Sequence, residues 1–147
     1  MKTIKTSELV GTALDWVLAR IEFAEEETIQ LGFIDGLPCA YEDTDGKRIV
    51  IAYLTPGFLG PKGTPRAKRT HPDAWRYSPS SDWAQGGSLA QRELIGTVPP
   101  LDGLGWAAAY VRIGSFSYGA TPLIAAMRCF VSNKLGDEVE VPDELFA

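Results

Sequence analysis

The chain is predicted to fold as a single α+β domain, in which an antiparallel sheet packs with amphipathic helices at its N- and C-terminal ends. Apolar stripes with helical spacing occur near both ends of the chain. Between them lie β-prone runs separated by Asp-Gly pairs. Because each helix has to bury its stripe on a sheet, we expect a layered, α-β-α sandwich-like packing.

The size and composition indicate one globular domain over residues 1–147. The chain is 45% hydrophobic and 22% charged, and it is long enough to bury a core without a metal or a disulfide. No apolar run reaches the roughly 18 residues that span a bilayer. The N-terminus also lacks the apolar stretch of a secretory signal, so we expect no membrane partner and a place in a cytoplasm.

Cys39 and Cys129 are the only cysteines and His71 is the only histidine. We interpret the cysteines as small buried hydrophobic residues. This inventory does not supply a structural zinc site, so neither a metal nor another cofactor is expected.

The N-terminal helix is predicted from apolar residues at i, i+3, i+4 and i+7, namely Leu14, Val17, Leu18 and Ile21. Thr12 and Asp15 have the spacing of a capping box. Strands follow over residues 28–54, where Asp35-Gly36 breaks the run and Asp45-Gly46 predicts a hairpin.

Further along the chain, residues 88–95 are compatible with a short helix or a strand, and residues 106–116 predict another strand. The C-terminal helix is the best-specified element. Thr121 is its expected N-cap, Pro122 suits the first helical position, and Gly136 fits the residue just past its end. Its apolar stripe comprises Leu123, Ala126, Met127, Phe130 and Val131.

A long surface loop rich in proline, glycine and basic residues is expected at about 55–76. Residues 62–76 hold five basic residues and one acidic residue, whereas the whole chain has a net charge of −5. Long loops in compact domains are usually functional or mobile. The overall acidity argues against binding of duplex DNA.

The stretch WRYSPSSDWAQGG, residues 75–87, is rich in turn-forming residues, so it is expected to form a loop, and it is the main candidate site. Its aromatic residues, Tyr77 and Trp83, offer stacking faces. Its other candidate residues offer hydroxyls, a carboxylate and close backbone approach to a ligand: Ser78, Ser80, Asp82, Gly86 and Gly87. The structural alternative is that the serines and Asp82 cap turns, Trp83 fills the core and the glycines turn the chain.

Three arginines are candidates for neutralising an anionic ligand: Arg69, Arg76 and Arg128. A guanidinium grips phosphate through two parallel hydrogen bonds, and the helix N-terminus near Thr121 is a further anion-binding candidate. The alternative is that these arginines are solvated surface residues.

His71 is the one histidine that could serve as a base, and no nucleophile motif, phosphate loop or dinucleotide fingerprint accompanies it.

Three blocks resemble the NinX family of phage proteins: TSELVGTALDW, YSPSSDWAQGG and GATPLIAAMRCFVSNKLGDEVEVPDEL. They occur in the family's order and cover about half of the chain, whereas residues 28–74 match less clearly. The central S-P-S/T-D motif is also similar to that of small phage domains with a helix–sheet–helix sandwich. The resemblance implies a phage accessory protein in the bacterial host cytoplasm, and it carries over no catalytic residues.

These observations favour a non-enzymatic binder of a small anionic, nucleotide-like molecule, which would sequester or sense a ligand such as a host defence signal. The first alternative is a protein-interaction module that inhibits a host protein. The second is a small nucleotide hydrolase that uses Asp82 and His71. Exposed helix faces and edge strands also make a homodimer an open alternative.

Overall fold

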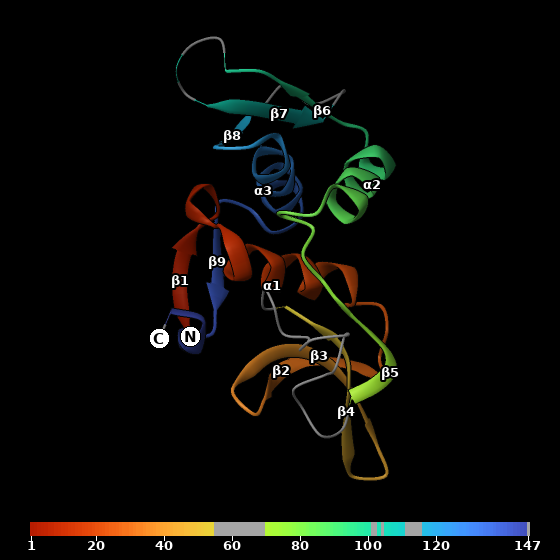
Figure 1. The fold of residues 1–147 in the computed structure, drawn as a ribbon. Helices are drawn as coiled ribbons and strands as arrows, with labels where there is room; N and C mark the ends of the chain where they lie inside the picture. The colour runs from red at the N-terminus through yellow and green to blue at the C-terminus, as the bar shows by residue number, and fades with distance from the viewer. Residues whose placement is uncertain (55–69, 101–102, 104, 111–115, 147) are drawn as a thin grey trace.

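The computed structural model shows three sheets and three helices in the part of the chain that it describes (Figure 1). It describes residues 1–54, 70–100, 103, 105–110 and 116–146, with the backbone alone for residues 44 and 70–75. The elements in chain order are β1 (Lys2–Lys5), a 3-10 turn (Thr6–Glu8), α1 (Gly11–Glu22), β2 (Ile29–Ile34), β3 (Leu37–Thr44), β4 (Lys47–Tyr53), β5 (Thr70–Arg76), α2 (Trp83–Glu93), β6 (Ile95–Val98), β7 (Trp106–Tyr110), β8 (Ser117–Gly119), α3 (Pro122–Leu135), β9 (Glu138–Val141) and a final 3-10 turn (Asp143–Phe146).

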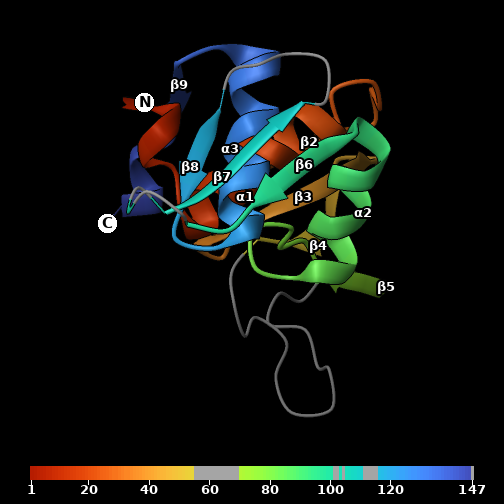
Figure 2. The ribbon, with the colours of Figure 1, turned by 90° about the horizontal axis from the view of Figure 1, so that it is seen from above.

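The helices lie between the two larger sheets. The β6-β7-β8 sheet covers one side of α3, while α1 lies on the other side of α3 and above the sheet that begins with β2 and β3 (Figures 1 and 2). The α+β class is thus confirmed, but the expected α-β-α order is wrong because the layers run sheet–helix–sheet.

Burial on several sides explains this layer order. In α1 the seven consecutive residues from Ala13 to Ala19 are all buried, including Asp15. In α3 the predicted stripe is buried, and so are Ala125 and Cys129, which lie beside that stripe. A helix covered on more than one face belongs inside the layers rather than on the outside. Both cysteines are buried and free, as expected.

The four-stranded sheet has the order β2-β3-β4-β5, and the three-stranded sheet has the order β6-β7-β8. Their pairs are antiparallel, except that β5 runs parallel to β4. The loop expected at 55–76 is therefore wrong for residues 70–76, which form β5. Its remaining part, residues 55–69, lies outside the described residues.

Both Asp-Gly turns are confirmed. Asp35 and Gly36 have φ of 53° and 77° between β2 and β3, and Asp45 and Gly46 have φ of 54° and 76° between β3 and β4. Positive φ at both central residues is the geometry of the tightest hairpin turns. The chain ends come together through β1 and β9, which form an antiparallel pair.

The caps decide where the helices begin. Thr121 caps α3 by accepting a hydrogen bond from the Ile124 N–H at 3.1 Å, as predicted. The capping box expected at Thr12 and Asp15 is wrong, because α1 begins at Gly11 and Val10 caps it without a side-chain bond. No helix in the described part of the chain is long and apolar enough to cross a membrane.

Candidate functional site

The central motif, residues 76–87, connects β5 to α2 through hydrogen bonds to its own backbone. The Gln85 side chain accepts from the Ser78 N–H at 2.8 Å and donates to the Arg76 carbonyl at 2.7 Å. From α1, the Asp15 carboxylate accepts from the Ser80 N–H at 2.9 Å. Ser78 and Ser80 are 3% and 5% exposed, so their hydroxyls do not line an open ligand site.

The Asp15 carboxylate lies in the buried layer of α1, where it has few water molecules to solvate its charge. Burial raises its pKa to about 6, although hydrogen bonds from Ser80 and the positive charge of Arg76 act in the opposite direction. Asp15 therefore fixes the backbone of the motif at an electrostatic cost.

Tyr77 is also part of the core. It is 6% exposed, and its ring packs against Phe23 with centroids 5.4 Å apart. Burial raises the pKa of its hydroxyl well above the usual range, so the side chain stays neutral. Tyr77 is thus not available to stack on a ligand base.

Asp82 and the two glycines build the start of α2. Asp82 caps this helix by accepting from the Ala84 N–H at 2.9 Å, and it also accepts from the Gln85 side chain at 3.2 Å. A Cβ on Gly86 would collide with the Pro79 carbonyl oxygen and lie 2.7 Å from a Leu123 methyl. The close approach that this glycine permits is therefore to the protein itself.

Trp83 is the exposed aromatic residue of the motif. It is the first residue of α2 and is 60% exposed, and its ring lies so close to Gly87 that a Cβ there would be 3.2 Å from it. The expectation that residues 75–87 form a loop is wrong at both ends, because residues 75 and 76 belong to β5 and residues 83–87 are helical. The structure therefore does not bring the motif's aromatic and polar side chains together on one surface.

The other candidates near the motif are dispersed. Arg76 is half-buried at the end of β5, close enough to Asp15 for a favourable electrostatic interaction. Arg69 lies outside the described residues, and of His71 only the backbone is described, in β5. The acid–base pair of Asp82 and His71 is thus not supported, since Asp82 is occupied as a cap.

Arg128 lies in a different place, in an open groove of about 360 Å³ that we call the Arg128 groove. Its lining residues come from the first and last parts of the chain: Lys5, Thr6, Ser7, Phe116, Ser117, Tyr118, Arg128, Ser132, Asp137 and Glu138. Segments that are more than 100 residues apart in sequence meet here because β1 pairs with β9 beside α3 (Figure 1).

The guanidinium of Arg128 is held by carbonyl groups. Its Nε donates to the Leu9 carbonyl at 2.8 Å, and its Nη1 donates to the Tyr118 carbonyl at 2.8 Å. Among the described residues it forms no ion pair, and burial lowers its pKa without removing its charge. Since five N–H groups are present on a guanidinium, Arg128 retains donors for an anion.

Besides Arg128, the charged residues that line the groove are one basic residue, Lys5, and two acidic residues, Asp137 and Glu138. Lys5 and Glu138 are directly opposite in the β1–β9 pair, where opposite charges attract. Phe116 and Tyr118 are 56% and 37% exposed and add aromatic surface to the groove. Sequence reasoning identified Arg128 but missed these two rings and Lys5, because only the folded chain places them together.

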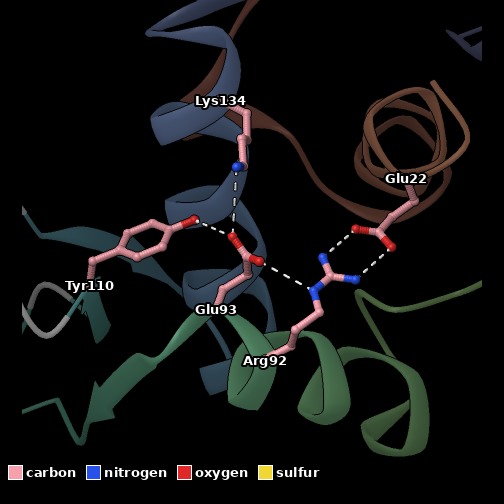
Figure 3. Close-up of polar contacts among 5 residues, drawn as sticks. All are labelled: Glu22, Arg92, Glu93, Tyr110 and Lys134. Carbon is pink, nitrogen blue, oxygen red and sulfur yellow. Dashed lines mark hydrogen bonds and ion pairs between the residues drawn. The ribbon is translucent and has the colours of Figure 1, made fainter. Parts of the chain in front are cut away.

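A second polar cluster joins α1, α2, β7 and α3 (Figure 3). Arg92 binds Glu22 through two hydrogen bonds of 2.6 and 3.1 Å, and its Nε binds Glu93 at 3.2 Å. Glu93 also accepts from the Tyr110 hydroxyl at 3.4 Å and lies 3.8 Å from the Lys134 ammonium. Each charge already has a partner, so we interpret this cluster as a structural connection between helices.

The described residues contain no group of three or more histidine, cysteine, aspartate or glutamate side chains that could hold a metal ion.

Comparison with known proteins gives a family match. The family model described as "Bacteriophage P22, NinX" matches residues 5–134. The match spans the central motif and α3, and it also includes residues 28–74, where the resemblance by motifs is weakest. No curated protein matches the chain.

Proposed function

The chain belongs to the NinX family of phage proteins, and on this premise we propose that it is an accessory protein that binds a small anionic, nucleotide-like molecule in the Arg128 groove. The observation that carries the proposal is the half-buried Arg128 guanidinium in a groove with two exposed aromatic rings. Within the described part of the chain, this guanidinium has no carboxylate partner. A guanidinium group beside aromatic rings is suited to a molecule that combines an anionic group with a planar base.

Size and chemistry support this location over the central motif. A groove of about 360 Å³ falls within the roughly 300–1,000 Å³ of small-molecule sites. Hydroxyls of Ser7 and Ser132 line the groove and would bond phosphate or sugar oxygens. In the motif, by contrast, Tyr77, Ser78 and Ser80 are buried.

The proposed action is sequestration or sensing rather than turnover. Among the described residues, the groove lacks a histidine or cysteine, and its carboxylates come from Asp137 and Glu138. In the cytoplasm of a bacterial host, sequestering a nucleotide signal would blunt a defence response that depends on it.

Thermal denaturation against mono-, di- and cyclic nucleotides and a host metabolite extract tests the proposal. A ligand at 100 times its Kd stabilises the native state by about 2.7 kcal/mol, which corresponds to roughly 5–10 °C for a chain of this size. We expect Phe116→Ala and Tyr118→Ala to reduce the ligand-induced shift. Trp83→Ala, a change at an equally exposed aromatic residue outside the groove, serves as the matched control.

The outcomes separate the alternatives. If Trp83→Ala removes the shift and the groove variants keep it, the site lies at the motif instead. If no nucleotide or extract changes the melting temperature, small-molecule binding is refuted. A ligand recovered chemically altered after incubation would identify an enzyme rather than a binder.

A second function, a protein-interaction module that inhibits a host protein, is favoured by the 60% exposure of Trp83. Large aromatic residues are enriched at binding hot spots. Loss of a host-protein complex on Trp83→Ala, with nucleotide response unchanged, would support this interpretation.

A further inference from the structure

β2 is an edge strand whose own sequence lacks the usual protection against further pairing. It lies at the end of the four-stranded sheet, with β3 as its neighbour on one side and no strand of the described chain on the other. Its sequence, IQLGFI, contains no charge and no proline. Natural edge strands usually carry lysine, proline or a bulge that prevents the addition of another strand.

The register of the hairpin identifies which backbone groups face outward. Ile34 and Leu37 flank the two-residue turn and form a hydrogen-bonded pair, so Phe33–Pro38 and Leu31–Ala40 are non-hydrogen-bonded pairs. The N–H and C=O groups of Leu31 and Phe33 therefore point away from β3, along the open edge. No hydrogen bond to another described residue occupies these groups.

An apolar cleft of about 500 Å³ adjoins this edge. The apolar residues that line it include Trp16 on α1, Phe23 just after α1, and Ile29 and Leu31 on β2. Trp16 is itself fixed by stacking on Phe33, with ring centroids 5.4 Å apart. An added strand would place every second side chain into this cleft, since side chains alternate between the faces of a strand.

The surrounding charge is predominantly acidic. Glu25, Glu26 and Glu27 are exposed just before β2, Asp35 is exposed just after it, and none of the four forms an ion pair with a described residue. The cleft also holds two cations, of which the Met1 amine is paired with a carboxylate and Arg20, bound to a neutral carbonyl, keeps its charge. Arg20 donates to the Glu140 carbonyl at 2.9 Å, and the Met1 amine bonds Asp143 at 3.1 Å.

This charge pattern also disfavours a second copy of the chain as the occupant. In an antiparallel β2–β2 pair, the glutamates of residues 25–27 would lie beside Asp35 of the other copy at both ends. Like charges placed together cost free energy, whereas lysine or arginine at the ends of an added strand would be attracted.

We propose that the open edge of β2 binds an extended segment of a partner protein by strand addition, with apolar side chains in the cleft and basic residues at its ends. This surface is separate from the Arg128 groove, and its test does not depend on the proposed function. Backbone hydrogen bonds to Leu31 and Phe33 would supply affinity, and the cleft and the acidic ends would supply selectivity.

The probe is an acetylated seven-residue peptide in which three valines alternate with two threonines between terminal lysines. We expect it to bind the purified protein in calorimetric titration and to protect the Leu31 and Phe33 amides from hydrogen exchange. The same peptide with terminal glutamates should bind at least tenfold more weakly. In an extended peptide, the valine N–H groups point to one edge and the threonine N–H groups to the other. A peptide N-methylated at the valines and one N-methylated at the threonines are therefore blocked at opposite edges, so one of the two should bind and the other should not.

Two pairs of protein variants separate the contributions. Leu31→Pro removes an outward N–H while keeping the β2–β3 ladder, and Leu31→Ala shortens the same side chain but keeps the N–H; the proline variant should bind at least tenfold more weakly than the alanine variant. The double variant E26Q/E27Q should weaken binding several-fold, whereas the control E8Q/E144Q, also at exposed glutamates, should not.

The proposal is overturned if the lysine peptide does not bind up to millimolar concentration, if both methylated peptides bind equally, or if the glutamate peptide binds as well. It is also overturned if the protein is a dimer that Leu31→Pro converts to a monomer. Because the peptide series uses the unaltered protein, the result stands even where a proline variant fails to fold.

Discussion

Asp15→Asn is expected to stabilise the protein at neutral pH. The substitution keeps an oxygen that accepts from the Ser80 N–H but removes the buried charge of the carboxylate. Burial raises the pKa of Asp15 from 3.8 to about 6. Between these two values the native state binds more protons than the unfolded state, so the carboxylate contributes instability that increases as pH rises.

The magnitude follows from the two pKa values. A pKa difference of one between the native and unfolded states corresponds to about 1.4 kcal/mol, so the charge costs about 3 kcal/mol at pH 7.5 and about 1 kcal/mol at pH 4.5. The stability advantage of Asp15→Asn should therefore grow by about 2 kcal/mol between these pH values. Near neutral pH it corresponds to a melting temperature about 6–12 °C higher.

Urea denaturation of both proteins at the two pH values, followed by tryptophan fluorescence, measures this difference directly. Comparing the variant with the unaltered protein cancels the titration of all other groups. Asp15→Ala is the control, since it removes the acceptor as well and should lose about 1–3 kcal/mol relative to Asp15→Asn. An advantage that is the same at pH 4.5 and 7.5, or an asparagine variant that is less stable at pH 7.5, would refute the reasoning.

Five further substitutions at four positions test the interpretation of the motif and the helix caps, with the free energy of unfolding as the measured quantity. Gly86→Ala should cost about 1–3 kcal/mol or more because the new methyl group meets the Pro79 carbonyl, whereas Gly87→Ala, which meets the exposed ring of Trp83, should cost less than about 1 kcal/mol. Thr121→Ala should cost about 1 kcal/mol by removing the N-cap bond of α3, and Thr121→Ser should restore most of it. Trp83→Ala should change stability by less than about 1 kcal/mol because the side chain is 60% exposed.

Urea midpoints at constant m-value provide the measurement in each case. Equal effects of Gly86→Ala and Gly87→Ala would contradict the close approach of α2 to Pro79. A stable Thr121→Ala variant would mean that packing alone sets the start of α3. A strongly destabilised Trp83→Ala variant would mean that its ring supports the core.

Short sequence patterns correctly predicted the elements that depend only on residues close together in the sequence. The N-cap, the proline at the first position and the stripe of α3 act within one helix, and both Asp-Gly turns depend on two residues each. The sheet–helix–sheet order depends instead on whether a second face of each helix is covered by another part of the protein. Ala125 and Cys129 carry that information in α3, but small residues beside a stripe are compatible with either a covered or an exposed face.

The parallel strand β5 and the strand β1 were missed for a similar reason. Thr70–Arg76 contains a proline and follows a long segment rich in proline and glycine, so no local pattern predicts that it joins β4. β1 has a single half-buried residue, Ile4, and becomes a strand by pairing with β9 at the far end of the chain. Pairings between distant segments are not encoded in either segment alone.

The central motif shows why a composition typical of a ligand site need not indicate one. Serine, aspartate and glycine serve ligands through the same hydroxyls, carboxylates and close approaches that they use to cap helices and admit neighbouring backbone. Two residues resolve this ambiguity. Asp15 lies outside the motif, and Gln85 lies within it but was not among the candidate site residues. Asp15 accepts from Ser80 across 65 positions, and Gln85 occupies the Ser78 N–H and the Arg76 carbonyl. Since these polar groups already have protein partners, Arg128 is the stronger candidate for binding a ligand, because two carbonyls hold its guanidinium and it forms no ion pair with a described residue.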